Sequence, residues 1–274
     1  MPLDRYAVQT KAHTAISILA WQASTIEGDT MTIRKALPLT LVLIVALALP
    51  ACKKDDDEDE RSPAPASALA PEPAAPVQQP GKTLVYNFDN MQPGPLPATF
   101  STALTGGGPP PAWEIRADET APSRPNVLAQ TSKDQTDYRF PMAVSNEGAF
   151  KDLELRVKFK PVSGKIDQAG GLVLRYKDAN NYYILRANAL ENNFRLYHVV
   201  NGKRVQFAGA NTTVTSGQWH ELSLTCVGNR FTCSFDGKQL IQATDGTFKD
   251  AGKIGVWTKA DSVTYFDDLS VTAK

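Results

Sequence analysis

The sequence of 274 residues contains little of what several function classes require. It has three cysteines and three histidines, too few for a disulfide-rich scaffold or for a zinc centre built mainly from histidine. Its 29 basic residues are balanced by 29 acidic ones, so it lacks the surplus of Lys and Arg with which nucleic-acid-binding proteins neutralise phosphates. The motifs His-Glu-x-x-His, Gly-x-Ser-x-Gly and Cys-x-x-Cys are absent. We therefore expect no nucleic-acid partner and no chemistry of these common motifs.

Residues 31–51 have the pattern of a secretory signal peptide. Arg34 and Lys35 precede an uncharged, mostly apolar run over residues 36–51, which is short of the about 20 residues of a membrane-spanning helix. The run ends in Leu-Pro-Ala-Cys at Cys52 and resembles the bacterial lipoprotein box, whose cysteine is lipidated. The resemblance implies a lipid anchor at Cys52 that holds the protein in a bacterial cell-envelope membrane, facing the periplasm or the exterior. The alternative is an ordinary signal anchor with an incidental cysteine.

The segments on either side of this leader lack the composition of a folded domain. Residues 1–30 place acidic and polar residues ahead of the apolar run, so we interpret them as a misassigned start or a disordered segment, with translation beginning at Met31. Residues 52–81 contain an unbroken run of acidic residues followed by a stretch rich in Pro and Ala. Like charges repel and Pro-rich chains are extended, so we expect a spacer between membrane and domain.

Residues 82–274 contain every Phe of the chain and have the pattern of an all-β domain. Short β-branched and aromatic runs alternate with turn residues, and no window shows convincing helical periodicity. In residues 153–160 apolar and charged side chains alternate, as in a strand with one buried and one exposed face. Asn201-Gly202 and Asp236-Gly237 indicate tight hairpins, because Asn, Asp and Gly tolerate positive φ. These features predict an antiparallel β-sandwich.

The pattern predicts a series of short strands and one irregular loop. Residues 101–111 are rich in Gly and Pro toward their end and are predicted to lack regular structure. The predicted strands cover residues 83–88, 113–117, 127–130, 153–160, 171–176, 182–187, 194–200, 205–208, 219–227, 231–235, 239–243, 254–258 and 263–271.

Two cysteines lie in adjacent predicted strands. Cys226 and Cys233 flank the turn at Gly228-Asn229, and both are expected on the core side as opposite or diagonal neighbours. Export makes a disulfide chemically feasible. The alternative is a pair of buried free thiols that act as small apolar side chains.

Several segments of this domain resemble one family. They are residues 167–176, 181–197, 201–204, 217–222, 252–262 and 265–269. They resemble the concanavalin A-like (laminin G-like) jelly-roll superfamily and, within it, the bacterial domain labelled 3-keto-disaccharide hydrolase, a relative of family 16 glycoside hydrolases. The resemblance spans nearly all of residues 83–272 and implies a jelly-roll sandwich. Because the superfamily contains lectins, glycosidases and adhesion modules, the resemblance implies the fold more strongly than an activity.

The three-acid strand motif of family 16 enzymes, Glu-x-Asp-x-x-Glu, is missing. The nearest acidic strand positions are Asp152 and Glu154, and no third acid follows them. A retaining glucanase mechanism is therefore not expected. If the protein cleaves glycosidic bonds, the candidate catalytic carboxylates are Glu191, Glu221 and Asp261.

Sugar recognition requires aromatic faces for the C–H side of a pyranose ring and amide, carboxylate or guanidinium groups for its hydroxyls. Neighbouring strands of one concave sheet are expected to supply such side chains, although each of them alone is also of a type that packs a core or covers an outer face. The candidate ligand-binding residues are Arg175, Tyr183, Arg186, Asn188, Arg195, Tyr197, Trp257, Lys259 and Asp261.

The resemblance also implies a metal site. Jelly-roll carbohydrate modules of this kind often hold a structural Ca²⁺ between an N-terminal acid and an acid of the last strand. In this sequence Asp89 and Asp268 occupy those places, and carboxylate oxygens suit a hard cation. The alternative is that both acids only cap turns.

Three functions remain open. The first is a cell-envelope lipoprotein whose sandwich binds a glycan, which the missing three-acid motif favours. The second is a glycoside hydrolase of the 3-keto-disaccharide hydrolase type, which the resemblance favours. The third is a protein-interaction module that uses the same sandwich.

Overall fold

The computed structural model describes residues 75–274, and this part of the chain is built from strands alone. Residues 1–30, the predicted signal peptide, Cys52 and the linker up to residue 74 lie outside the described residues. Within the described part, no helix is long and apolar enough to cross a membrane. The strands are β1 (Thr83–Tyr86), β2 (Gly94–Pro95), β3 (Phe100–Gly106), β4 (Trp113–Ala117), β5 (Asn126–Gln130), β6 (Arg139–Ser145), β7 (Leu153–Ser163), β8 (Ala169–Asp178), β9 (Asn181–Asn188), β10 (Asn193–Val200), β11 (Lys203–Asn211), β12 (His220–Val227), β13 (Arg230–Phe235), β14 (Lys238–Thr244), β15 (Lys253–Trp257) and β16 (Val263–Ala273).

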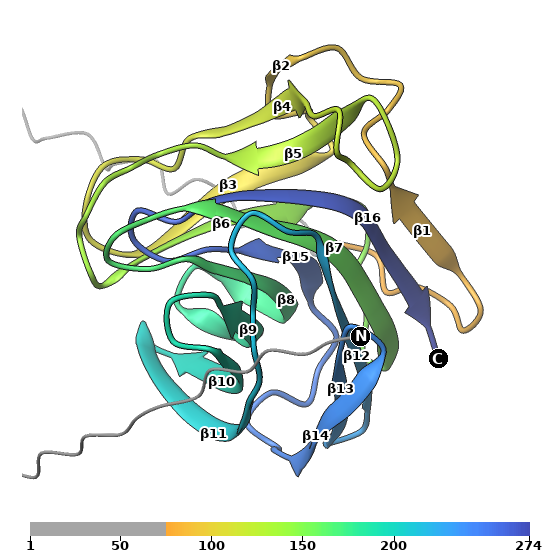
Figure 1. Cartoon of the computed structure of the whole chain (residues 1–274). Coiled ribbons are helices and arrows are strands. Elements are labelled where there is room, and N and C mark those ends of the chain that lie inside the picture. Colours follow the sequence, from red (N-terminus) through yellow and green to blue (C-terminus); the bar gives the residue numbers. More distant parts are fainter. Residues whose placement is uncertain (1–74) are drawn as a thin grey trace, which may run out of the picture. The chain divides into compact units, whose positions relative to one another are not determined.

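Two antiparallel sheets pack face to face and form a sandwich (Figure 1). One sheet has nine strands in the order β14-β13-β12-β7-β16-β5-β4-β2, with β1 paired to β16. The other has seven strands in the order β11-β10-β9-β8-β15-β6-β3. The predicted all-β, antiparallel sandwich is therefore confirmed.

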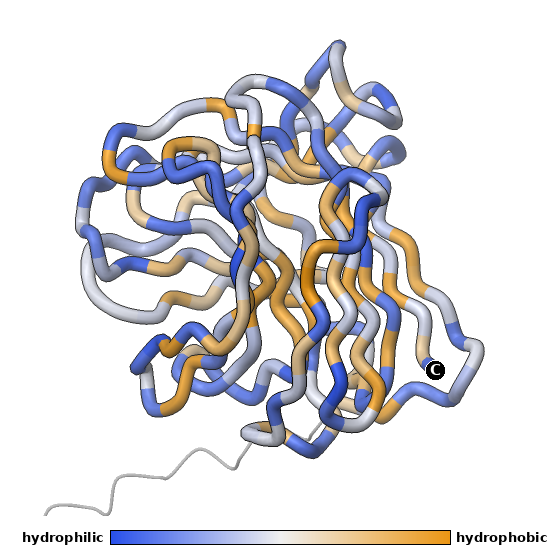
Figure 2. The backbone as a smooth tube through the Cα atoms, turned by 60° about the horizontal axis from the view of Figure 1, so that its bottom comes forward, coloured by the Kyte–Doolittle hydropathy of each residue, from blue (hydrophilic) through white to orange (hydrophobic). Residues whose placement is uncertain are grey.

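The alternating pattern of residues 153–160 forms the central strand β7, which pairs with β12 and β16. Leu153, Leu155, Val157 and Phe159 are buried between the sheets, and the charged residues between them point outward. Burying an apolar side chain of this size stabilises the fold by about 1.5–3 kcal/mol. Figure 2 shows the same succession of apolar and polar residues along the strands. The period of two in the sequence thus decides which face of β7 enters the core.

The prediction of an irregular loop over residues 101–111 is wrong in its first half. Strand β3 runs through Phe100–Gly106 and pairs with β6 along its whole length. The breakers begin only at Gly106, and the β-compatible residues before it form an edge strand. Strand β6 is also missing from the predicted strands, and it contains Pro141. Proline argues against an interior strand, but Pro141 lies just beyond the pairing of β6 with β15, which ends at Met142.

Cys226 and Cys233 are buried free thiols. Cys226 lies opposite Phe231 and Cys233 lies opposite Leu224, so the two cysteines are diagonal neighbours in the core. Of the two alternatives, the structure has free thiols and no disulfide between them. Burial raises the pKa of Cys226 to about 11, which keeps this thiol protonated and unreactive at neutral pH.

The last residues of the predicted linker hydrogen-bond to the sandwich. The Pro76 carbonyl accepts from the N–H of Ala149 at 2.9 Å, and the N–H of Gly81 donates to the Ala273 carbonyl at 2.9 Å. These bonds attach residues 76–81 to the segment between β6 and β7, which contains Ala149, and to Ala273 at the end of β16. The hydrogen-bonded part of the domain therefore begins before residue 82.

The outer face of the seven-stranded sheet curves around a second apolar cluster. Tyr138, which precedes β6, donates its hydroxyl to the Gly202 carbonyl in the β10–β11 hairpin at 2.8 Å, and Thr105 in β3 hydrogen-bonds Tyr182 in β9. Strands that are far apart in the sheet order therefore meet across this face. The middle of the face is filled by Phe140, Met142, Val144, Ala169, Val173, Tyr182, Ile184, Tyr197, Val199 and Trp257.

Candidate functional site

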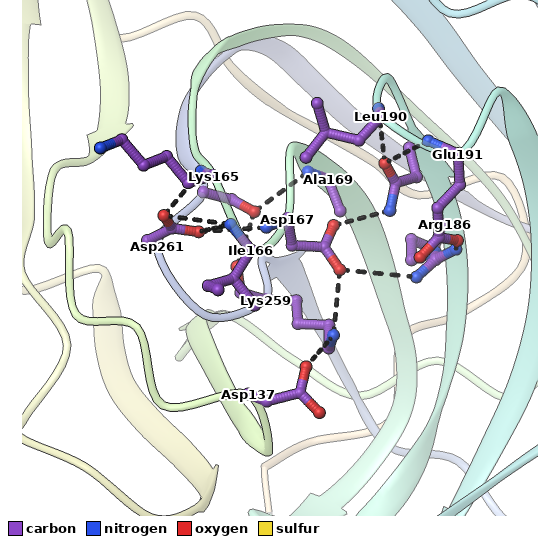
Figure 3. A network of polar contacts seen from close by, with 12 residues as sticks. Asp137, Lys165, Ile166, Asp167, Ala169, Arg186, Leu190, Glu191, Lys259 and Asp261 are labelled. Carbon is purple, nitrogen blue, oxygen red and sulfur yellow. Dashed lines mark hydrogen bonds and ion pairs between the residues drawn. The ribbon is translucent and has the colours of Figure 1, made fainter.

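Buried charged and amide side chains gather at one end of this curved outer face (Figure 3). At their centre is Asp167, whose side chain is fully buried in the segment that leads into β8. Asp167 Oδ2 lies 3.2 Å from Lys259 Nζ and 3.9 Å from Arg186 Nη1, and Oδ1 accepts a hydrogen bond from Asn188 Nδ2 at 2.7 Å. We name the following six residues the polar cluster: Asp167, Arg186, Asn188, Glu191, Asn193 and Lys259.

Asp261 fixes the segment that carries Asp167. Its carboxylate accepts hydrogen bonds from the backbone N–H groups of Lys165, Ile166 and Asp167 at 2.7–3.1 Å. Gly164 permits the turn before them, because its φ is +157° and a Cβ there would lie 1.9 Å from the Asp167 carbonyl oxygen. Figure 3 shows Asp261 facing this backbone while the Asp167 carboxylate faces Lys259 and Arg186. Asp261 thus positions Asp167.

The charges around Asp167 oppose the effect of its burial. Burial raises the pKa of the Asp167 carboxyl, while the positive charges of Arg186 and Lys259 lower it. Lys259 also pairs with the exposed Asp137, and this hydrogen bond lowers the pKa of Asp137. Lys259 therefore bridges a buried carboxylate and an exposed one.

Glu191 and Asn193 form the solvent side of the polar cluster. Arg186 Nη2 donates to Glu191 Oε2 at 2.5 Å and to Asn193 Oδ1 at 2.7 Å, and Asn193 Nδ2 donates to the same Glu191 oxygen at 2.7 Å. Asn188 Oδ1 accepts from the N–H groups of Leu190 and Glu191, which shapes the β9–β10 turn. Burial alone would raise the pKa of Glu191, but the charge of Arg186 holds it below its ordinary value. With 47% of its side chain exposed, Glu191 is the solvent-facing carboxylate of the cluster.

Aromatic rings form a floor beside the polar cluster. Trp257 in β15 lies opposite Gly171 in β8, where a Cβ would come within 3.4 Å of the indole and 2.7 Å of the Leu185 carbonyl oxygen. Glycine therefore lets the indole lie close to the sheet. The Arg186 guanidinium carbon lies 5.6 Å from the ring centre of Tyr197. Trp257 Nε1 and Arg186 Nε are buried and have no hydrogen-bond partner in the described part of the chain.

The structure brings together most of the side chains predicted for ligand binding and two of the three predicted catalytic carboxylates: Glu191 lies in the polar cluster, and Asp261 is held by backbone N–H groups beneath it. Those in the polar cluster come from β9, from the β9–β10 turn and from the segment after β15. The predicted residues that lie in the cluster or directly support it are Arg186, Asn188, Glu191, Tyr197, Trp257, Lys259 and Asp261.

The other predicted residues bind different parts of the structure. Arg175 donates to three loop carbonyls, and the Tyr183 hydroxyl bonds a loop aspartate from inside the sandwich core. Arg195 donates to a carbonyl and a side chain of the neighbouring β11. Glu221 lies on the outer side of the nine-stranded sheet, 2.8 Å from Lys158. Within residues 75–274, these four side chains are held by partners outside the polar cluster, and their roles in binding or catalysis stay predictions.

Sequence reasoning misses three residues of this site, Asp167, Asn193 and Arg204. Asp167 lies in an irregular segment whose facing depends on Asp261, 94 residues later in the chain. Arg204 comes from β11, two strands away from the centre of the cluster in the sheet order. Asn193 could have been predicted as a site residue from the sequence, because a short hairpin places it directly opposite the predicted Asn188.

The predicted calcium ligands are not part of a larger set of acidic side chains. Asp89 Oδ1 faces the N–H of Asn126 at 3.4 Å, and the N–H of Asp268 donates to Asp267. Residues 75–274 contain no group of three or more His, Cys, Asp or Glu side chains that could hold a metal ion. Calcium takes roughly six to eight oxygen ligands, so Asp89 and Asp268 would need several carbonyl or water ligands besides. The calcium site stays a prediction.

A cavity of about 520 Å³ lies where residues 75–77 meet β3, β6, β8 and β15. Its charged lining residues, Lys177, Asp178 and Lys253, are exposed or half-buried. It therefore lacks the fixed, buried charges of the polar cluster. We regard the polar cluster as the candidate site for this reason.

The polar cluster offers both hydrogen-bond donors and acceptors in fixed places. The cations Arg186 and Lys259 and the amide of Asn193 can donate to hydroxyl or carbonyl oxygens. Glu191 can accept a hydrogen bond or take up a proton. The arrangement suits a small ligand rich in oxygen.

Comparisons with known proteins identify relatives of this sandwich. Residues 104–272 match the family of 3-keto-alpha-glucoside-1,2-lyase-like domains. No curated protein matches the chain. The solved carbohydrate binding module CBM66 from Bacillus subtilis is similar over 64% of this chain and 98% of its own, with 18% identity and a TM-score of 0.51. This likeness shows a shared fold.

Two further solved structures resemble the chain more distantly. A protein of unknown function with a galectin-like fold from Bacillus subtilis has a TM-score of 0.47 and 12% identity, over 69% of this chain and 98% of its own. The exoplasmic domain of VIP36, solved with Ca²⁺ and Man3GlcNAc, has a TM-score of 0.47 and 11% identity, over 64% and 84%. The family match, in contrast, covers more than half of this chain and all six residues of the polar cluster. The chain therefore belongs to the family of 3-keto-alpha-glucoside-1,2-lyase-like domains.

Proposed function

We propose that the chain binds carbohydrate at the polar cluster. One observation carries this proposal: Arg186 Nε is a buried donor with no partner in the described part of the chain, and the same guanidinium lies 3.9 Å from Asp167 and 2.5 Å from the half-exposed Glu191. A buried polar atom without a partner costs about 1–3 kcal/mol. A ligand that brings several hydroxyl groups would recover part of this cost.

The surroundings of these atoms support a sugar as the ligand. Arg186, Lys259 and Asn193 present donors and Glu191 presents an acceptor, which is the mixture that vicinal hydroxyls need. The edge of the aromatic floor at Tyr197, which is 7% exposed, supplies a small apolar surface next to them, and the fully buried Trp257 supports it from below. The carbohydrate binding module with the same fold, and the family description that names a keto glucoside, agree with this assignment.

Binding can be tested by calorimetry with the full chain, after a glycan array has selected sugars. Arg186→Gln is expected to weaken binding at least about tenfold, because a charged hydrogen bond contributes about 1.5–3 kcal/mol. Arg230→Gln on β13 changes the same residue type at an exposed place on the other sheet and is expected to leave affinity unchanged. Since Arg186 is buried, Glu191→Gln serves as a second, solvent-facing variant and is expected to weaken binding only a few-fold. Absence of binding to every glycan would contradict the proposal.

Cleavage of a 3-keto glucoside is a second candidate function, favoured by the family match and by the position of Glu191. The ketone at C3 makes the hydrogen at C2 acidic. A base takes this proton, the C1–O bond breaks, and its electron pair leaves with the leaving-group oxygen, which then takes up a proton. Glu191, held ionised by Arg186, is the base in this scheme. Arg186 and Lys259 would stabilise negative charge on the C3 oxygen.

Turnover distinguishes cleavage from binding alone. The full chain is incubated with a 3-keto glucoside, and the released alcohol and the unsaturated sugar are followed by NMR. Glu191→Gln is expected to lower turnover about 100-fold or more while affinity changes only a few-fold. Glu154→Gln, a solvent-facing carboxylate of the other sheet, is the matched control. Unchanged turnover in Glu191→Gln would remove Glu191 from the scheme.

We also propose that Cys52 carries a lipid that anchors the domain to a bacterial cell-envelope membrane. The basic start, the apolar run and Cys52 at its end support this proposal. Mass spectrometry of the mature N-terminus and fractionation of cells are the direct tests. The Cys52→Ala variant is expected to leave the membrane fraction, and an unmodified Cys52 in the wild type would contradict the proposal.

A further inference from the structure

Arg204 is a half-buried arginine held across the aromatic floor beside the polar cluster. Its backbone N–H donates to Tyr138 Oη at 2.9 Å, and this hydroxyl in turn donates to a carbonyl of the β10–β11 hairpin, so the start of β11 is fixed. The guanidinium carbon lies 4.6 Å from the ring centre of Phe140 and 4.7 Å from that of Tyr197. A third ring, that of Trp257, lies 5.8 Å away. The guanidinium therefore has a defined place before any ligand arrives.

The N–H groups of this guanidinium have no acceptor among residues 75–274. Arg204 Nη1 is buried and unpartnered, and Arg204 forms no ion pair with a described residue. The other buried arginines differ in this respect. Arg139 and Arg175 each donate to several backbone carbonyls, and Arg186 donates to Glu191 and an amide. Among these four, Arg204 is the one whose guanidinium donates no hydrogen bond to a described residue.

The charges near Arg204 act in opposite directions, because Asp167 raises the pKa of the guanidinium while Arg186 lowers it. Burial lowers the pKa of Arg204, and the like charge of Arg186 lowers it further. The nearest buried carboxylate, Asp167, is already shared by Lys259, Arg186 and the Asn188 amide. An unpaired charge that is partly withdrawn from water is costly to the fold. The Arg204 guanidinium therefore has no carboxylate in direct contact among the described residues, although the site around it contains Asp137, Asp167 and Glu191.

We propose that Arg204 receives the carboxylate of an acidic sugar, so that the ligand of this site is a glycan that contains a uronic acid. The inference rests on the carbohydrate site proposed above and specifies the charge of its ligand. A carboxylate matches the planar fork of a guanidinium with two parallel hydrogen bonds. A neutral hydroxyl would occupy one donor and leave the charge unpaired. Arg204 is thus the residue that selects for charge, while Arg186 and Asn193 bind hydroxyls.

The test compares the affinity of the full chain for four probes by calorimetry: methyl glucopyranoside, methyl glucopyranosiduronate, glucose 6-sulfate and acetate. The uronate is expected to bind at least about tenfold more tightly than the neutral glucoside. In Arg204→Gln this preference is expected to fall below about threefold while the affinity for the neutral glucoside is kept. Arg204→Lys should retain part of the preference, because it keeps the charge and loses the fork. Arg230→Gln is the control and should retain all of it.

Each other outcome has a definite meaning. Equal affinity of the wild type for uronate and glucoside would overturn the inference and leave the carbohydrate site intact. Tighter binding of the sulfate than of the uronate would overturn the carboxylate as the anionic group. Acetate binding as tightly as the uronate would overturn the sugar as its carrier. Binding of none of the sugars would instead refute the proposed function. If Arg204→Gln fails to fold, the comparison of uronate with glucoside in the wild type still decides.

Discussion

The outer faces of the two sheets carry the same kinds of charged side chains in opposite surroundings. On the nine-stranded sheet, Arg156 pairs with Glu154 and Glu221, and its side chain is 49% exposed. On the seven-stranded sheet, Arg186 pairs with Asp167 and Glu191, and its side chain is 3% exposed. The first face carries these ion pairs in contact with water. The second face curves inward and withdraws its charges from water.

This difference shows which charges indicate a site. An exposed ion pair contributes little to the free energy of folding, so its presence is weak evidence for a functional site. A buried charge is retained at a cost of several kcal/mol and needs a partner or a role. Asp167, Arg186 and Lys259 meet this condition together, whereas Arg156 and Glu221 on the other sheet do not. The buried charges of that sheet, Lys160 and Asp267, have separate partners, Asp118 and Ser123. Burial, rather than residue type, therefore separates the ion pairs of Arg186 from those of Arg156.

Removing the buried carboxylate should have the largest effect. Asp167→Asn is expected to lower the free energy of unfolding by about 3 kcal/mol, because Lys259 and Arg186 lose their shared buried counter-ion and keep only the solvent-facing Asp137 and Glu191. Urea unfolding followed by tryptophan fluorescence measures the change. The double variant with Lys259→Met should recover part of the loss, since one uncompensated cation is gone. If Asp167→Asn lowers the free energy of unfolding by less than about 1 kcal/mol, the buried ion pairs of Asp167 contribute no more to stability than the exposed pairs of the other sheet.

A buried carboxylate without a cation should give a smaller effect that depends on pH. Asp267 in β16 accepts hydrogen bonds from the backbone N–H of Ser123 and from its hydroxyl at 2.9–3.1 Å, and burial raises its pKa from 3.8 to about 6. Between about pH 4 and pH 6 the folded state therefore holds a proton that the unfolded state has lost. The stability this proton provides is complete below pH 4 and is lost as the pH rises through 6.

Comparison with Asp267→Asn isolates this group from the other carboxyls. From pH 4 to pH 7, the wild type is expected to lose about 2 kcal/mol of unfolding free energy relative to the variant. Urea unfolding of both proteins at several pH values measures the difference. Parallel pH profiles would show that Asp267 titrates in the same way in the folded and unfolded states.

Breaking an exposed pair should have the smallest effect. Glu154 lies 2.6 Å from Arg156 and 2.5 Å from Lys274, yet all three side chains are in contact with water. Glu154→Gln is expected to cost less than about 1 kcal/mol, and this cost should shrink in 1 M salt. The same urea titration at two salt concentrations measures both quantities. If Glu154→Gln lowers the free energy of unfolding by more than about 2 kcal/mol, exposed and buried ion pairs contribute similarly to stability, and the difference argued above is wrong.

The strands were predictable wherever one face of the strand is buried and the other is exposed to solvent. Residues 113–117 are predicted and observed with the same bounds, and the alternation in β7 places its apolar side chains correctly. Prediction fails where pattern and composition disagree with the fold. Pro141 in β6 and the breakers after β3 conceal two strands whose pairing is decided by neighbours far away in the sequence.

The candidate site was predictable only in part. Arg186, Asn188 and Lys259 have suitable chemistry on or next to predicted strands, and the structure brings them together. Arg175 has the same chemistry, but its side chain is occupied by loop carbonyls. Asp167 could not be predicted from the sequence, because it lies in an irregular segment. Such a segment has no alternation of apolar and polar residues from which the direction of a side chain could be deduced.

By itself the sequence determined an all-β sandwich, its hairpins and its family, since these follow from a period of two, from turn residues and from local motifs. Only the tertiary structure decided which charges are buried together and which arginine is left without a partner. The reason is physical. Hydrogen-bonded pairing fixes neighbours on adjacent strands, whereas Asp167, Glu191, Arg204 and Lys259 meet through the curvature of a whole sheet and the packing of three loops upon it. No short stretch of sequence encodes that curvature.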